Sequence, residues 1–236
     1  MRAPNRILDL DELETPAFRQ VLDPMDELTG SDPISYLHPS KRWEYPWALE
    51  RARLPPGASV LDAGCGASIF PVYLAKQGYS VTAVDLSPPS GLDKFHNVKA
   101  GYVAGDMGKL PFADAVFDAV FCISVIEHLG FGAMAAALSE MRRVLKSEGR
   151  LLLTTDYYED AAARIQYEGE GGPFPVEWSF FDAERLKEHI LDAPGWRLEG
   201  ELDLRVDWEH TKPLMRRFHG YPYTSVGVTL VKVRRV

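Results

Sequence analysis

The segment SVLDAGCGASIF, residues 59–70, leaves an apolar run through a turn built almost entirely from small residues. Asp62 is the one carboxylate of the turn, and the glycines Gly64 and Gly66 follow it. Glycines let a ligand approach the backbone closely, and a helix that starts here directs its unpaired N–H groups to the same place. The segment therefore predicts a strand, a turn and a helix that together bind a ligand.

The chain from residue 58 to about 156 alternates short apolar runs with helical patterns. Such runs between helices are typical of a parallel sheet that is covered on both faces, so we expect a doubly wound α/β sheet. The longest amphipathic stretch is expected to be a helix that ends at Gly149. The expected strands, in chain order, are 58–63, 79–87, 97–106, 117–127 and 150–156.

Three carboxylates end the first three of these strands. Ligands of open α/β sheets bind at the carboxyl ends of the strands, where Asp85 would accept hydrogen bonds from ribose hydroxyls and Asp106 would lie near an adenine. The third glycine of a dinucleotide motif is replaced by Ile69, and Asp62 would repel a pyrophosphate. The pattern favours S-adenosylmethionine, which carries an ammonium and a sulfonium, over a nicotinamide cofactor.

Four segments of the chain resemble successive motifs of the class I S-adenosylmethionine-dependent methyltransferases, in the type 11 small-molecule group. The resemblance implies a Rossmann-like seven-stranded sheet of order 3-2-1-4-5-7-6, with strand seven antiparallel. It also implies transfer of a methyl group to O, N or C of a small-molecule acceptor, with S-adenosylhomocysteine as the product. A fainter similarity of RWEYPWALER points to carbohydrate or natural-product acceptors. The four segments are VLDAGCG, VDLS, GDMGKLPFADAVFDAVFCISVIEH and EMRRVLKSEGRLLLTT.

The same resemblance assigns roles at the cofactor site. It places Asp62 and the backbone at Gly64 against the methionine amino and carboxylate groups. It places Asp85 at the ribose hydroxyls and Leu86 against the adenine. The other cofactor residues are Cys65 and Gly66 in the turn, Asp106 at the adenine amino group, Met107 as an apolar wall, and Ser124 beside the methionine moiety.

Glu127 and His128 follow the fourth expected strand at the ligand edge of the sheet. His128 is a candidate general base, because the ordinary pKa of histidine lies near neutrality. The alternative is that this pair packs against or caps the next helix. Apart from this pair, the sequence offers no spacing that suggests a metal site.

Two aromatic segments flank the sheet pattern. We expect residues 1–57 to form an N-terminal helical cap or substrate lid, and residues 58–236 to form the methyltransferase domain with a lid insertion at 157–181, in one compact unit. Aromatic side chains above the strand ends would exclude water and hold the acceptor; the alternative is that they pack together as a small cap. The candidate acceptor residues are Tyr36, Trp43, Tyr45, Trp47, Tyr157 and Trp178.

The formal charge of −8 argues against a nucleic-acid partner, because phosphate binding needs clustered Lys and Arg. The densest basic runs, MRRVLK and MRRFH, are interpreted as solvated helix faces. The two cysteines show no zinc or redox spacing, no leader-like segment is visible, and no apolar run is long enough to span a membrane. We therefore expect a cytoplasmic chain, with the acceptor and the oligomeric state left open.

Two other functions are compatible with the pattern. One is a non-catalytic protein that binds S-adenosylmethionine for regulation or partner contact, which the cofactor carboxylates argue against without excluding. The other is a protein or RNA methyltransferase, which the acidic charge and the lack of an added domain make less favoured.

Overall fold

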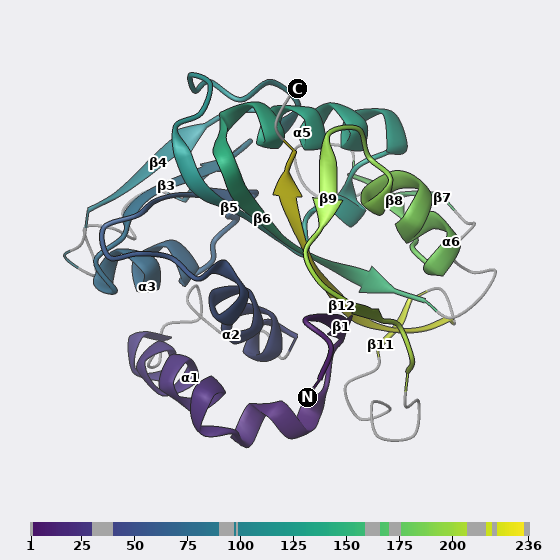
Figure 1. Ribbon diagram of the computed structural model, residues 1–236, viewed down its shortest axis with the longest axis horizontal. Coiled ribbons are helices and arrows are strands. Elements are labelled where there is room, and N and C mark those ends of the chain that lie inside the picture. Colours follow the sequence, from purple (N-terminus) through teal and green to yellow (C-terminus); the bar gives the residue numbers. More distant parts are fainter. Residues whose placement is uncertain are drawn as a thin grey trace.

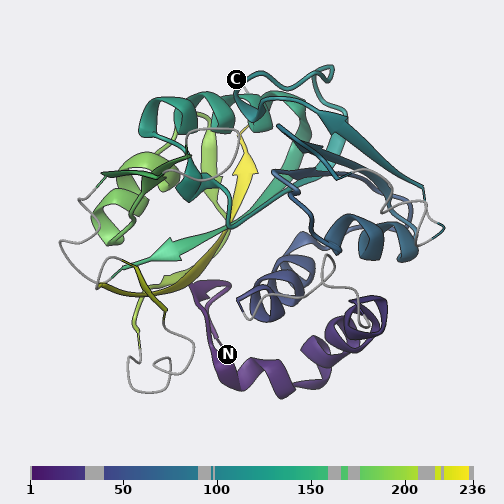
Figure 2. The same cartoon turned by 180° about the vertical axis from the view of Figure 1, so that it is seen from behind.

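A ten-stranded mixed sheet runs through the described chain and carries helices on both faces (Figures 1 and 2). The computed structural model describes residues 2–29, 40–89, 97, 99–158, 166–169, 176–206, 216–218 and 221–233. The strands of this sheet are β1 (Asn5–Ile7), β2 (Ser59–Ala63), β3 (Ser80–Asp85), β4 (Ala100–Ala104), β5 (Phe117–Ile123), β6 (Leu145–Tyr157), β9 (Trp196–Leu198), β10 (Leu202–Asp203), β11 (Arg216–Phe218) and β12 (Tyr221–Lys232). A separate antiparallel pair is formed by β7 (Gln166–Gly169) and β8 (Val176–Ser179).

The helices include short 3₁₀ and π segments at the strand ends. The α-helices are α1 (Pro16–Thr29), α2 (Lys41–Ala52), α3 (Phe70–Lys76), α5 (Phe131–Val144) and α6 (Ala183–Leu186). The 3₁₀-helices are η1 (Leu10–Glu14), η3 (Met107–Lys109) and η4 (Ile126–His128), and the π-helix η6 (Lys187–Leu191) continues α6.

Five parallel strands form the centre of the sheet, in the order β4-β3-β2-β5-β6. They correspond to the five expected apolar runs, and the expected doubly wound α/β class is confirmed. Their carboxyl ends meet along one edge, so the residues that follow β2, β3, β4 and β5 are brought together there. This edge is where the sequence places a ligand.

The sheet is extended on the far side of β6, where β12 pairs antiparallel with it. The outer edge of β12 pairs with β9 and, further along, with β1 from the N-terminus, and β10 pairs in turn with β1. The sheet therefore has more strands at this side than the seven-stranded expectation. The described part of residues 1–57 contributes the strand β1 to the sheet and the helices α1 and α2 to one of its faces.

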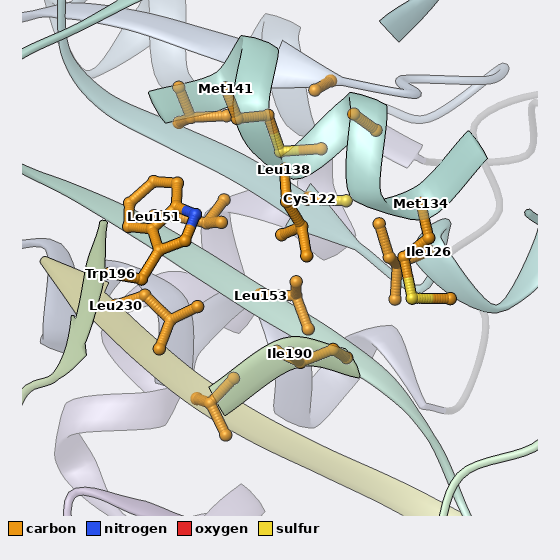
Figure 3. Close-up of a cluster of buried hydrophobic side chains, with 14 of the residues drawn as sticks. Cys122, Ile126, Met134, Leu138, Met141, Leu151, Leu153, Ile190, Trp196 and Leu230 are labelled. Carbon is orange, nitrogen blue, oxygen red and sulfur yellow. The ribbon is translucent and has the colours of Figure 1, made fainter. Parts of the chain in front are cut away.

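Each face of the sheet buries its own apolar core because alternate strand residues point to opposite faces. On one face, Val60 and Phe121 pack with α1, α2 and α3. On the other face, Cys122 and Leu153 pack with α5 and the helix at Ile190, as Figure 3 shows. Both cysteines of the chain are free and buried.

One helix boundary differs from the expectation. The helix α5 ends at Val144, five residues before Gly149, because Leu145 is extended and pairs with Phe117 as the start of β6. Gly149 lies in that strand, where an added Cβ would come within 2.9 Å of the Leu145 side chain. The glycine therefore serves a close approach within the sheet and does not end the helix.

Candidate active site

The turn after β2 is closed toward the sheet and open on its outer side. Gly64 has φ +81°, and its N–H donates to the carbonyl of Val84 at 2.8 Å. A Cβ at Gly64 would lie 2.4 Å from Val125 Cγ1 and 3.0 Å from Met107 Cε, so no larger residue fits. At Gly66, with φ +48°, an added Cβ would meet nothing within 4 Å. A ligand can therefore approach the backbone at Gly66.

Asp85 is held in a fixed orientation beside this turn. Its Oδ2 accepts the Gly66 N–H at 2.9 Å and its Oδ1 accepts the Ser87 N–H at 3.1 Å. The next residue, Leu86, is 53% exposed. Two carboxylate oxygens with spare lone pairs and an exposed apolar face suit a ribose and its attached base.

Asp106 takes the equivalent place after β4. It caps the 3₁₀-helix η3, with Oδ1 accepting the Gly108 N–H at 2.7 Å. Met107 follows in η3 and reaches the glycine turn at Gly64. The ends of β2, β3 and β4 are therefore brought together as the sequence predicts, although ligand contacts at these residues stay a prediction.

Asp62 is a buried carboxylate without a partner in the described chain. Its side chain is 4% exposed and accepts no hydrogen bond from the described residues. Burial raises the pKa of Asp62 to about 7, with Lys41 acting to lower it and Asp85 to raise it. An ionised carboxylate in such a place is costly unless a cation joins it, and the ammonium of a ligand would supply that cation.

The helix α2 brings a charged pair, Lys41 and Glu44, to the same edge of the sheet. The sequence interpretation missed this pair. Lys41 Nζ lies 3.0 Å from Glu44 Oε2 and donates to the carbonyl of Ile123 at 2.9 Å. The Ser124 hydroxyl donates to Glu44 Oε1 at 2.8 Å, and Ser124 has φ +50°. A strained non-glycine residue marks a place that its surroundings fix firmly. The visible signal was a lysine and a glutamate three residues apart in an aromatic stretch.

Lys41 is the central cation among the buried acids of this edge. Burial acts to lower the pKa of Lys41, but the Glu44 carboxylate, with help from Tyr45 and Glu127, outweighs it and raises the pKa above its ordinary value. Lys41 therefore stays charged. Its charge in turn acts to lower the pKa of Asp62 and Glu127.

The aromatic side chains of α2 separate into two groups. Tyr45 shares a hydrogen bond of 2.6 Å between its OH and Ser68 Oγ, and its ring stacks on Phe70 at 4.3 Å, so it lies beside the glycine turn. Trp43 and Trp47 are fully buried, and their indole N–H groups donate to Glu12 and to the Pro4 carbonyl. Trp43 and Trp47 therefore pack in the core beneath α2.

Other aromatic candidates are placed only in part. Tyr157, at the end of β6, is 5% exposed and belongs to the core. Tyr36 lies outside the described residues, as do 159–165 and 170–175 of the expected lid insertion. Trp178, in β8, contacts His128 with ring centroids 4.2 Å apart in an edge-to-face arrangement.

Glu127 and His128 lie in η4, directly after β5, and their environments differ. Glu127 is buried, and its Oε2 accepts the Thr155 hydroxyl at 3.1 Å. Burial and the neighbouring Asp156 raise the pKa of Glu127 well above its ordinary value. Burial, with the charge of Lys41, lowers the pKa of His128 to about 4, so its imidazole is neutral at pH 7. Its Nδ1 is buried and has no partner in the described chain.

Neither cysteine nor metal chemistry is suggested by the described part of the chain. Burial raises the pKa of the Cys65 thiol, so Cys65 is not a thiolate. The described residues hold no group of three or more His, Cys, Asp or Glu side chains that could bind a metal ion. Among them, too, no helix has the length and apolar character needed to cross a membrane.

Comparisons with known proteins identify related methyltransferases. Residues 61–153 match a family described as "Methyltransferase domain". The chain is 38% identical over 129 residues to a malonyl-[acyl-carrier protein] O-methyltransferase of Erwinia pyrifoliae, covering 53% of this chain and 48% of that protein. It is 42% identical over 106 residues to a demethylmenaquinone methyltransferase of Mycobacterium marinum, covering 43% and 42%. The chain thus spans about half the length of these curated relatives.

A solved structure with the same fold comes from Burkholderia thailandensis. It is a 1,6-didemethyltoxoflavin-N1-methyltransferase with bound 1,6-didemethyltoxoflavin and S-adenosylhomocysteine. Its TM-score is 0.53 at 21% identity, and the match covers 94% of this chain and 80% of that one. At this identity the similarity supports the fold.

Proposed function

Because the chain carries a class I S-adenosylmethionine-dependent methyltransferase domain, we propose that it transfers a methyl group from S-adenosylmethionine to an oxygen atom of a small acidic molecule. The observation that carries the proposal is the edge formed by Asp62, Asp85 and Asp106. When bound, the cofactor supplies a methyl group made reactive by its sulfonium. The chain's own residues then bind the cofactor and the acceptor, orient them for the transfer and exclude water.

The residues present fit such a cofactor. Asp62 is the buried carboxylate without a partner, and an ammonium would provide one. Asp85 and the exposed Leu86 suit a ribose and an adenine, with Asp106 and Met107 continuing the adenine side. The open backbone at Gly66 leaves room for the ligand. A pyrophosphate would instead meet an added negative charge at Asp62.

The acceptor class is inferred from the environment of His128, a neutral imidazole whose ring lies edge-to-face with Trp178 and whose buried Nδ1 has no partner in the described chain. A base whose pKa lies near 4 accepts a proton well from an acidic group and poorly from an aliphatic alcohol. For a phenolic acceptor, the O–H loses its proton to His128 while the oxygen takes the methyl group and the sulfur keeps the electron pair of the broken S–CH₃ bond. A carboxylate acceptor is already ionised at pH 7 and takes the methyl group without a base. One relative is named as a malonyl-[acyl-carrier protein] O-methyltransferase, which favours an acidic oxygen acceptor. Carboxylates and phenolic hydroxyls are therefore the first acceptor types to test.

The test of this proposal is an acceptor screen that measures S-adenosylhomocysteine production. The panel contains carboxylic acids, phenols and hydroquinones, aliphatic alcohols and amines. We expect turnover with the acidic oxygen acceptors. Turnover only with alcohols or amines would overturn the proposed acceptor class, and cofactor binding with no turnover on any acceptor would favour a regulatory binding protein.

With a phenolic acceptor, replacing His128 with glutamine is expected to lower kcat by about a hundredfold, because the proton acceptor is lost. The dissociation constant for S-adenosylhomocysteine should stay within about twofold, since no cofactor contact is proposed for this residue. The matched control is His189→Gln, because His189 stacks on Phe131 and not on Trp178. An unchanged kcat for His128→Gln would mean that His128 only packs against Trp178.

The affinity for S-adenosylhomocysteine is expected to rise with pH as Asp62 ionises. The pKa of Asp62 is raised to about 7, and the ligand ammonium pairs only with the ionised form, so binding should be about tenfold weaker at pH 6 than at pH 8. Asp62→Asn should remove this pH dependence. This result would show that the titrating group is Asp62 and not Glu127, whose pKa is also raised. A flat wild-type profile across this range would contradict the assignment.

The same raised pKa has the opposite effect on the unliganded protein. Folded Asp62 keeps a proton that the unfolded chain loses above the ordinary value of 3.8. Its contribution to stability is therefore fully present below about pH 4 and is lost as the pH rises to about 7. Thermal unfolding of the wild type and of Asp62→Asn across this range measures the difference.

A further inference from the structure

A hollow lined by several charged side chains lies at the end of the sheet opposite to the candidate active site. Its volume is about 650 Å³, and it is bordered by the last turns of α5, the turn before β5 and the end of β12. The helix α5 begins three residues after His128 and ends beside the hollow, and its 14 residues span about 21 Å. The hollow is therefore separate from the cofactor edge.

Most charged groups around this hollow already have partners. Arg143 binds both carboxylate oxygens of Glu140 at 2.7 Å and Asp114 at 2.8 Å. Lys232 donates to the carbonyl of Leu145. Three cations and two carboxylates line the hollow, so its lining has one net positive charge in a chain whose formal charge is −8.

Arg142 is the exception among these groups. It makes no hydrogen bond or ion pair within the described chain, and its Nε is buried without a partner. Its stem lies against Gly195, where an added Cβ would come within 2.9 Å of Arg142 Cδ and Nε. The half-buried Arg142 is therefore held in place by packing, and its Nε is left unsatisfied, which is costly for a buried donor.

We propose that Arg142 binds a small anion in this hollow, through a phosphate or carboxylate group. A guanidinium presents paired N–H donors that match the oxygens of either group. The exposed hydroxyls of Ser139 and Ser147 line the same hollow and supply further donors. The basic run MRRVLK, interpreted from the sequence as a solvated helix face, thus contributes the proposed binding group.

The test is titration of the full chain with inorganic phosphate, and separately with acetate, at constant ionic strength set with chloride. Calorimetry gives the affinity for each ion, and comparing the two ions distinguishes phosphate from carboxylate groups. We expect saturable binding of at least one ion, weakened at least about tenfold by Arg142→Gln because charge-assisted hydrogen bonds are lost. Arg197→Gln is the matched control, because Arg197 is exposed on the neighbouring strand β9 and does not line the hollow.

A second variant keeps the test valid if Arg142→Gln does not fold. Ser139→Asp places a carboxylate at an exposed position of the lining, and it should also abolish anion binding while the thermal unfolding in chloride stays near that of the wild type. Undiminished anion binding in the folded variants would overturn the proposal, and so would the absence of saturable binding of either ion by the wild type. S-adenosylhomocysteine should bind with the same affinity to the wild type and to the variants. This separate titration distinguishes a failure of the proposed cofactor site from a failure of the proposed anion site.

Discussion

Replacing Asp85 with alanine is expected to weaken S-adenosylhomocysteine binding by a factor of about 10² to 10⁴, because two hydrogen bonds to a charged acceptor are lost and each contributes roughly 1.5–3 kcal/mol. The carboxylate is already fixed by the amides of Gly66 and Ser87. Its remaining lone pairs therefore need no reorganisation to bind the ribose hydroxyls. Calorimetric titration measures the change.

Two further variants separate a ligand contact from a change in the turn. Asp85→Asn keeps one carbonyl oxygen and should lose less affinity than Asp85→Ala. Asp23→Ala removes an exposed carboxylate of α1 that pairs with Arg19 and should leave the affinity unchanged. If Asp85→Ala binds as tightly as the control variant, Asp85 does not contact the ligand.

Replacing Lys41 with methionine is expected to lower the free energy of unfolding by about 3–5 kcal/mol, because it leaves the Glu44 carboxylate buried and unpaired. Glu44 is 0% exposed, and Lys41 is its cation at 3.0 Å. For a chain of this size the loss corresponds to a fall in Tm of roughly 6–20 °C. Thermal and denaturant unfolding without ligand give both quantities.

The double variant Lys41→Met/Glu44→Gln tests the cause of this loss. Glutamine removes the uncompensated charge and still accepts the hydrogen bond from Ser124, so the double variant should recover most of the stability. Lys187→Met is the control, because the Lys187–Asp192 pair is exposed and surface pairs contribute little. A double variant no more stable than Lys41→Met would show that the charge of Glu44 is not the cause.

The carboxylates at the strand ends could be predicted because their position follows from local patterns. Asp62, Asp85 and Asp106 each come directly after or at the end of an apolar run, and parallel strands bring their carboxyl ends to one edge. The α/β class follows from the same alternation. No long-range information was needed for either inference.

The contribution of α2 could not be predicted in this way. Glu44 and Ser124 are 80 residues apart in the chain, and only the folded chain shows that they share a hydrogen bond. The sequence pattern predicted that Trp43 and Trp47 belong to an acceptor-binding lid, because aromatic residues of a site and aromatic residues of a core look alike in sequence. Burial distinguishes them, since Trp47 packs so closely on Gly227 that an added Cβ would lie 2.6 Å from its ring.

The N-terminal strand near the edge of the sheet was also beyond local patterns. The strand β1 has three residues, Asn5–Ile7, too short for a periodicity to be read. It is fixed by distant partners: Asn5 Oδ1 accepts the Thr229 N–H at 2.7 Å, and the Asn5 side-chain amide donates to the Glu199 and Glu201 carbonyls. The end of α5 at Val144 likewise depends on pairing with β5, not on helix propensity.

The most direct test of the proposed cofactor site is the Tm of the wild-type chain with S-adenosylhomocysteine, with NAD in parallel. At a hundred times its dissociation constant a ligand adds about 2.7 kcal/mol to the stability of the folded state, which for this size is a rise of roughly 5–10 °C. We expect this rise with S-adenosylhomocysteine and none with NAD. A rise with NAD alone, or no rise with S-adenosylhomocysteine, would contradict the assignment of Asp62, Asp85 and Asp106 to an S-adenosylmethionine site.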